Sequence, residues 1–243
     1  MEPSHGASPG ARPARGVFRI ERGRRFWPID AIGNLLSILD KVFLFNWRVG
    51  SRSISSAIEF HVREFATKHE LRGVTFRLNQ YAPFGELARL FRNERMSWVF
   101  RVCFGFPYFL TYTLWPWRLF GGDCFVPFRN SVHLFSDHIA IALHEAGHAL
   151  DFSRRRFLGA YMLLRFIPLG VLYQEFLASK YALGYLKELG DKKLLREAYK
   201  VLVPAFFTYI LGTLVPTTLQ TMLLLPMLIL GHLIGRVLAF TVA

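Results

Sequence analysis

Residues His144-Glu145-Ala146-Gly147-His148 form the stretch that decides the expected fold, because H-E-x-x-H on a helix is typical of a zinc site. Two histidines four residues apart lie one helical turn apart on the same face, so both imidazoles can reach one ion. Glu145 lies about a hundred degrees round the helix from His144, and it can face a water at that ion without binding the ion itself. The motif therefore predicts two metal ligands and a general base.

The sequence around the motif indicates a helix over residues 136–152, preceded by a short strand. Ser136 and Asp137 are residue types that commonly cap a helix, and the helix formers that follow them include no proline. Residues 130–135 alternate as a β-strand does, with Val132 on one face and His133 on the other. We therefore expect a strand that leads directly into the metal helix.

A catalytic zinc site needs a third protein ligand and one open position. Glu175 is the strongest candidate, because it opens a second amphipathic helix a plausible crossover length downstream. A solvated glutamate in the first turn of that helix is the alternative role for Glu175. Asp151 follows His148 by three residues on the same helix face. We expect Asp151 to orient a ligand histidine, or to act as a charge at the helix end, rather than to bind the ion.

The motif and the downstream glutamate together resemble the gluzincin branch of the zincin metallopeptidases. In that branch a glutamate from a following helix completes the site. The membrane-embedded CAAX-prenyl endopeptidases have the sequence pattern E-x-E-A-D in this region. Glu175 and Ala178 agree with that pattern, whereas Leu177 and Ser179 depart from it. The resemblance extends over residues 130–189. It implies a zincin-like core with a small β-sheet, a bound Zn²⁺, and Ser179 in the place of an aspartate that orients a ligand histidine.

These residues predict a zinc metallopeptidase, a hydrolase that acts on a peptide or membrane-protein substrate. Zn²⁺ bound by His144, His148 and Glu175 would lower the pKa of its water towards about 7 and polarise the scissile carbonyl. Glu145 would take the proton and pass it to the leaving amine. The donor to the oxyanion has four unranked candidates: His133, Tyr173, Tyr181 and Tyr209. A non-catalytic membrane scaffold with a structural zinc site and a zinc-dependent hydrolase of lipids or small amides remain as alternatives.

The composition indicates a membrane setting. Hydrophobic residues make up 52% of the 243 residues and aromatic residues 16%, which is richer than an ordinary soluble domain. This apolar character comes with a formal net charge of +13. Together the two properties favour basic flanks against anionic lipid, and the sequence contains no nucleic-acid-binding motif. The lipid bilayer is therefore the expected partner, and nucleic acid is not.

The C-terminal region carries the clearest membrane signal. Residues 201–235 contain no Asp, Glu, Lys or Arg, a stretch too long for one ordinary span and long enough for two short ones. A turn at residues 216–218 predicts a transmembrane helical hairpin of residues 202–215 and 219–237. We therefore expect an integral membrane protein of a bacterial inner membrane, with its catalytic domain on the cytoplasmic side. An organellar membrane is the other possibility, because the arginine-rich tail weakly resembles a transit peptide.

Two further apolar segments each allow two interpretations. Residues 102–117 contain two prolines and several tryptophans and tyrosines, and they suit either an interfacial or re-entrant segment or a core helix under the site. Residues 157–173 are apolar apart from Arg165, which argues against a true span. This second segment predicts either a loop that dips into the bilayer surface or a crossover helix packed on the core.

The whole chain is expected to be mostly α, of the α+β class, in three parts. Residues 1–27 form a disordered basic tail, residues 28–200 a zincin-like metallopeptidase domain with membrane-interfacial segments, and residues 201–243 the transmembrane hairpin. Within the domain, the predicted elements are helices at 29–45, 51–70 and 84–92 and a strand at 73–81. Cys103 and Cys124 lack the spacing of a metal pair and are expected to be free thiols.

Overall fold

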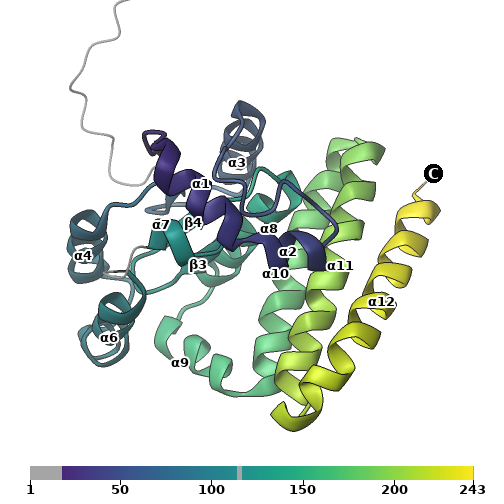
Figure 1. The fold of residues 1–243 in the computed structure, drawn as a ribbon. Coiled ribbons are helices and arrows are strands. Elements are labelled where there is room, and N and C mark those ends of the chain that lie inside the picture. The colour runs from purple at the N-terminus through teal and green to yellow at the C-terminus, as the bar shows by residue number, and fades with distance from the viewer. Residues whose placement is uncertain (1–17, 114–116, 243) are drawn as a thin grey trace, which may run out of the picture.

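The computed structural model describes residues 18–113 and 117–242, and the chain is mostly helical around one small sheet (Figure 1). The sheet has the order β1-β2-β4-β3. Strands β1 (Arg19–Arg22), β2 (Thr75–Leu78) and β4 (Ser131–Leu134) are parallel, and β3 (Cys124–Val126) pairs antiparallel with β4 at the edge. The predicted mostly α chain with a small β-sheet is therefore confirmed.

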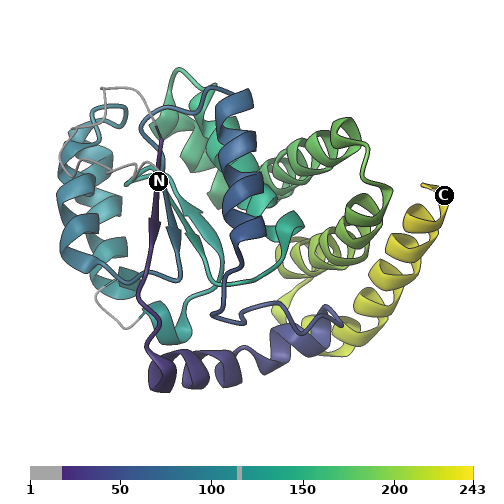
Figure 2. The ribbon, with the colours of Figure 1, turned by 90° about the horizontal axis from the view of Figure 1, so that it is seen from above.

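The sheet lies between two groups of helices (Figure 2). Helices α3 (Ser56–Lys68) and α8 (Ile139–Ser153) cover one face, and α4 (Pro83–Arg92) lies on the other side. Every residue of β2 and of β4 is buried, as expected for central strands that are covered on both faces. The core between the sheet, α3 and α8 includes Phe65, Phe76, Val132 and Leu143, all essentially without exposed surface.

The remaining elements complete the chain. Between β1 and α3 lie α1 (Trp27–Leu36) and α2 (Ile38–Phe43). Between α4 and β3 lie α5 (Trp98–Phe100), η1 (Arg101–Gly105), α6 (Phe106–Tyr108), η2 (Phe109–Thr113) and α7 (Trp117–Phe120). After α8 come α9 (Leu158–Leu163), η3 (Leu164–Phe166), α10 (Pro168–Leu189), α11 (Lys192–Leu214) and α12 (Thr217–Thr241).

Helix α8 packs against α10 at very close range. A Cβ atom added to Gly147 would lie 2.6 Å from the carbonyl oxygen of Ala178, a distance that real Cβ atoms do not adopt. Only a glycine opposite a small residue permits two helix backbones to approach in this way. The approach places the first half of α10 beside the middle of α8, which is the region that carries the H-E-x-x-H motif.

The start of α8 differs from the prediction. The helix begins at Ile139 with His138 at the N-cap position, and no side chain caps it. The Ser136 hydroxyl is hydrogen-bonded to Asp123, and an Asp137 carboxylate oxygen accepts from the backbone N–H of Ser55 at 2.8 Å. The two predicted caps therefore close loops around the helix start, because they find partners from distant parts of the chain.

The predicted disordered tail is wrong over residues 18–27, and residues 1–17 lie outside the described part. Strand β1 pairs with β2, Arg19 opposite Thr75, and α1 begins at Trp27. The Phe18 ring packs on Phe76 at 6.2 Å between ring centroids. A short basic segment folds here because backbone pairing with β2 and contact with the core are supplied by the rest of the chain.

The two ambiguous apolar segments take different forms. Residues 98–113 of the first segment form α- and π-helical turns beside α4 with many exposed side chains, so this part is not a core helix under the motif, and residues 114–116 lie outside the described part. Residues 157–173 fold as α9, η3 and the start of α10, with Tyr161 and Met162 buried and Phe166 and Leu169 exposed. The second segment is thus a crossover packed on the core that also presents apolar side chains outward.

The C-terminal helices form a hairpin with its turn at Pro216, as predicted, whereas the crossing of a membrane by both helices stays a prediction. Of the helices in the described part of the chain, α12 alone is long and apolar enough to cross a membrane. Helix α11 begins at Lys192, runs through the predicted domain boundary at residue 200, and buries Leu195 and Ala198 in the core. It carries charged side chains in its first turns because that half belongs to the domain.

Candidate metal centre

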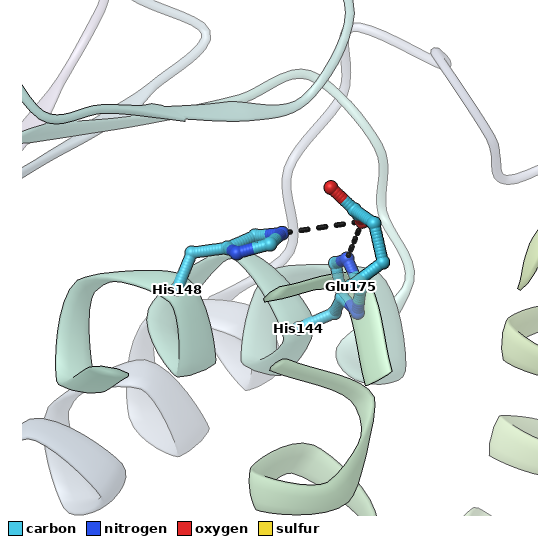
Figure 3. Close-up of side chains that lie close together, drawn as sticks. All are labelled: His144, His148 and Glu175. Carbon is cyan, nitrogen blue, oxygen red and sulfur yellow. Dashed lines mark hydrogen bonds and ion pairs between the residues drawn. The ribbon is translucent and has the colours of Figure 1, made fainter. Parts of the chain in front are cut away.

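Three side chains converge on one point between α8 and α10 (Figure 3). The Nε2 atoms of His144 and His148 lie 3.2 Å and 3.3 Å from the same carboxylate oxygen of Glu175, Oε2. One ligand atom from each residue falls within 4.8 Å of the others. Two atoms that each bind zinc at about 2.0–2.1 Å in a tetrahedral arrangement lie about 3.3 Å apart. The three buried residues therefore have the chemistry and the spacing to hold a metal ion.

The geometry follows from the two helices. His144 and His148 are one turn apart on α8, and their rings are 4.8 Å apart between centroids. Glu175 comes from α10, three residues before the Ala178 that touches Gly147. The close contact of the two backbones thus determines the distance from the carboxylate to the two imidazoles.

Two carboxyl groups of the site have opposite pKa shifts. Burial raises the pKa of Glu145 to about 7, and nearby Glu175 and Asp123 add to that shift. Burial acts in the same direction on Glu175, but the charges and hydrogen bonds of His148 and His144 outweigh it and hold the pKa of Glu175 well below its usual range. Glu175 is thus anionic beside the imidazoles, whereas Glu145 exchanges a proton near neutral pH.

Neighbouring polar groups hold the three residues in place. The hydroxyl of Ser179 lies 3.1 Å from Nδ1 of His144, so Ser179 occupies the orienting position that the resemblance implied. Arg165 donates to the other oxygen of Glu175 at 2.8 Å and to the side chain of Gln174 at 3.0 Å. Such outer contacts fix the orientation of metal ligands and tune their basicity.

Asp151 does not orient a ligand histidine. Asp151 is fully buried, and its carboxylate accepts one hydrogen bond from Nε of Arg155 at 3.1 Å and another from the hydroxyl of Tyr161. Nδ1 of His148 is buried without a hydrogen-bond partner among the residues that the structure describes. Asp151 instead ties the end of α8 to α9, because its side chain lies on the part of the helix face that α9 covers.

A cavity of about 370 Å³ is lined by His144 and Glu175 of the cluster, together with Glu145 and Ser179. Its further lining is largely apolar and comes from α2, α11 and α12, including Phe43, Phe206 and Leu224. The lining also includes Tyr209, one of the four tyrosine and histidine candidates for an oxyanion donor. The structure places His133 in a buried ion cluster beside Glu86, Tyr181 beside Arg154, and Tyr173 on the surface.

Two contributors to the site were not assigned a role from the sequence. In the sequence Arg165 stands out only as a charge within an apolar segment, and this unusual charge is the signal that could have pointed to its role. Asp123 lines the cavity and accepts from the backbone N–H groups of Phe135, at 2.7 Å, and Ser136, at 3.0 Å. Nothing in the sequence connects Asp123 with the motif, because the contact depends on the antiparallel pairing of β3 with β4, which brings the residue before β3 beside those after β4.

Comparison of the chain with protein-family models, with curated proteins and with solved structures finds no match. The class of site therefore rests on its own geometry, which is that of a cluster able to hold a metal ion next to a buried carboxyl group.

Proposed function

We propose that this protein is a membrane-associated zinc metallopeptidase, which hydrolyses peptide bonds with Zn²⁺ held by His144, His148 and Glu175. The observation that carries the proposal is that one ligand atom from each of these residues lies within 4.8 Å of the others. Glu145 lines the cavity that His144 and Glu175 also line. When bound, the ion supplies Lewis acidity and lowers the pKa of water, which is the role of zinc in hydrolases. Two imidazoles and one carboxylate are a set that suits zinc.

The protein's own residues divide the remaining chemistry. Glu145 has a pKa raised by burial to about 7, so it can accept a proton from the attacking water and then donate it to the leaving amine. Ser179 and Arg165 hold His144 and Glu175 in position from outside the ligand set. Of the four candidate oxyanion donors, Tyr209 lines the cavity, so we assign this role to its hydroxyl.

Two observations bear on the alternative functions. A purely structural zinc site is closed by four protein ligands, whereas this cluster offers three and adjoins a cavity, which favours catalysis over a scaffold role. The apolar lining contributed by Phe206 and Leu224 favours an apolar substrate. It therefore keeps hydrolysis of a lipid or a small amide as the second candidate function.

The test combines a metal assay with two site variants of the detergent-extracted protein. We expect one zinc per chain in the wild type, loss of that zinc in His148→Ala, and its retention in Glu145→Gln. Hydrolysis of a fluorogenic peptide library, or of acyl amides for the second candidate, should be lost in both variants, by about 10²–10⁴-fold for Glu145→Gln.

Glu197→Gln provides the matched control, because Glu197 is an exposed glutamate on α11 paired with Lys200. It should retain zinc and activity. Equimolar zinc together with unchanged hydrolysis in Glu145→Gln would contradict the catalytic role of Glu145. Folded, membrane-bound protein that binds no zinc would contradict the metal site itself.

A further inference from the structure

Helices α1 and α2 bury polar side chains and expose apolar ones, which is the reverse of a surface helix in a water-soluble protein. The residues that face the domain are polar: Asp30, Ser37 and Lys41 are all buried. Each has a partner inside the molecule. Asp30 accepts from Asn79 at 3.0 Å, Ser37 donates to the carbonyl of Gly33 at 2.9 Å, and Lys41 donates to a backbone carbonyl at 3.0 Å. The inner face is therefore satisfied by the fold.

The opposite side of the segment, the outer face of α1–α2, is apolar and exposed. Leu35 is 66% exposed and Leu39 63% exposed, although both are large aliphatic side chains. Surface helices of soluble proteins turn such residues inward. The outer face consists chiefly of Trp27, Ile32, Leu35, Leu39, Phe45 and Trp47.

This face continues onto α12. His232 of α12 is hydrogen-bonded through Nε2 to the backbone carbonyl of Phe43 at 2.8 Å, and its ring packs on Phe45 at 4.5 Å between centroids. A largely apolar groove of about 470 Å³ runs between α2 and α12. Figure 2 shows α1, α2 and α12 following one another along one edge of the molecule, with the rest of the domain behind them. In both views α1 and α2 run crosswise to α12.

We propose that the outer face of α1–α2 lies against the acyl chains of the lipid bilayer, as a second membrane element beside α12. Its continuity with α12, which alone among the described helices is long and apolar enough to cross a membrane, identifies lipid as the occupant. Its composition agrees, because it includes Trp27 and Trp47, and such amphipathic aromatic side chains favour the membrane–water interface. Arg25 lies two residues before Trp27 and Arg48 directly follows Trp47, and their charge complements anionic lipid.

The orientation follows from the same observations. A helical segment of this length extends about 25 Å and, with one polar and one apolar side, lies in the membrane plane. Its buried Asp30 and Lys41 are hydrogen-bonded within the protein on the side away from the lipid. The bilayer therefore contacts the same wall of the domain that lines the metal cavity through Phe43.

The test measures the surroundings of single labels on the full chain. Leu35→Cys and Leu39→Cys receive an environment-sensitive fluorophore in a background with Cys103→Ser and Cys124→Ala. The protein is placed in vesicles of phosphatidylcholine and phosphatidylglycerol, in roughly a three to one ratio, with and without bromine on the acyl chains. Phe84→Cys is the matched control, because Phe84 is 83% exposed on α4, at the far side of the sheet.

We expect brominated lipid to quench labels at 35 and 39 by about twofold or more and aqueous iodide to leave them unquenched, with the reverse at 84. Iodide quenching at 35 and 39 equal to that at 84 would overturn the proposal. Shielding from both quenchers would overturn it too, because protein rather than lipid would then cover the face. Without labels, Trp27→Phe combined with Trp47→Phe should reduce the quenching of tryptophan emission by brominated lipid, and unchanged quenching counts against the proposal.

Discussion

Two buried glutamates on different sides of the molecule show how the same residue type serves stability in one place and reactivity in another. Glu86 of α4 lies between Arg77 and Arg129, and the hydroxyl of Ser131 donates to it at 2.8 Å. His133 lies beside the same carboxylate at 3.4 Å. Glu175 of α10 also meets an arginine and histidines, but it shares a cavity with a second carboxyl group, Glu145.

The difference is one of charge balance. At the Glu86 cluster, two arginines face Glu86 and Glu21, and Arg77 contacts Glu21 at 2.7 Å, so the anions are matched by permanent cations. At the candidate metal centre, Arg165 is the one permanent cation that the described residues place against Glu175, and burial has raised the pKa of Glu145 to about 7. A cluster with balanced charge holds the fold together, whereas one that lacks positive charge is prepared for an added cation.

The largest effect is expected from breaking the balanced cluster. Glu86→Gln leaves Arg129 buried without its anion and Arg77 with Glu21 alone, and it should lower the free energy of unfolding by about 3–5 kcal/mol. The amount of zinc bound per folded chain should not change. Chemical denaturation in detergent with a parallel metal assay measures both quantities.

Glu59→Gln is the matched control, because Glu59 forms its ion pairs with Arg22 and Arg63 at the surface. Surface pairs contribute about 1 kcal/mol or less, so this variant should be nearly neutral. If Glu86→Gln lowers the free energy of unfolding as little as Glu59→Gln does, the Glu86 cluster does not stabilise the fold.

A smaller effect of the opposite sign is expected at the metal centre. The folded-state pKa of Glu145 is raised from about 4.5 to about 7, so its contribution to stability is present below about pH 4.5 and lost as the pH rises through about 7. A glutamine does not ionise, so Glu145→Gln avoids this loss of stability at higher pH. In chelator above pH 7 it should therefore stabilise the metal-free protein by about 1–3 kcal/mol relative to its effect at pH 4.5.

Glu175→Gln sharpens this test because its sign is reversed. The histidines lower the pKa of Glu175, so its contribution to stability is present above the unfolded value and is lost as the pH falls. Its replacement should destabilise the metal-free protein at pH 7. Thermal unfolding in chelator from pH 4.5 to 8 measures both variants, and two shifts of the same sign would show that the carboxyl groups do not differ as described.

The smallest effect is expected from the contact outside the ligand set. Ser179→Ala removes the partner at 3.1 Å from Nδ1 of His144, and it should weaken zinc affinity about tenfold, by competition with a chromogenic chelator. Ser153→Ala serves as control, because its hydroxyl bonds the backbone carbonyl of Leu150 and does not touch the ligands. Equal affinities in the two variants would mean that Ser179 does not orient His144.

The local parts of this architecture could be predicted from the sequence, and the contacts between distant segments could not. The spacing of His144 and His148 follows from helix geometry alone, and Glu175 follows from a second helix at a suitable distance. The structure brings these three residues together. Strand β1 escaped prediction because its order depends on pairing with β2, more than 50 residues later in the chain.

The same limit explains the errors at the α11 boundary and at Asp151. Helix α11 is apolar in its second half, but its first half packs in the domain, so the helix runs through the predicted boundary at residue 200. Asp151 has the correct helical spacing for a partner of His148, but its carboxylate is hydrogen-bonded to Arg155 and Tyr161 instead. Helical periodicity gives the face of a residue, whereas the neighbouring element determines its partner.

The contact between Gly147 and Ala178 has a consequence for how mutations of this chain would be read. Between the glutamate and the second histidine, the motif formally allows any residue, yet a Cβ at position 147 would meet the backbone of α10. In a saturation mutagenesis screen, position 147 should be as intolerant of substitution as the histidines. That intolerance would come from spacing between helices, and a sequence logo of functional variants would show it as an invariant glycine with no chemistry of its own.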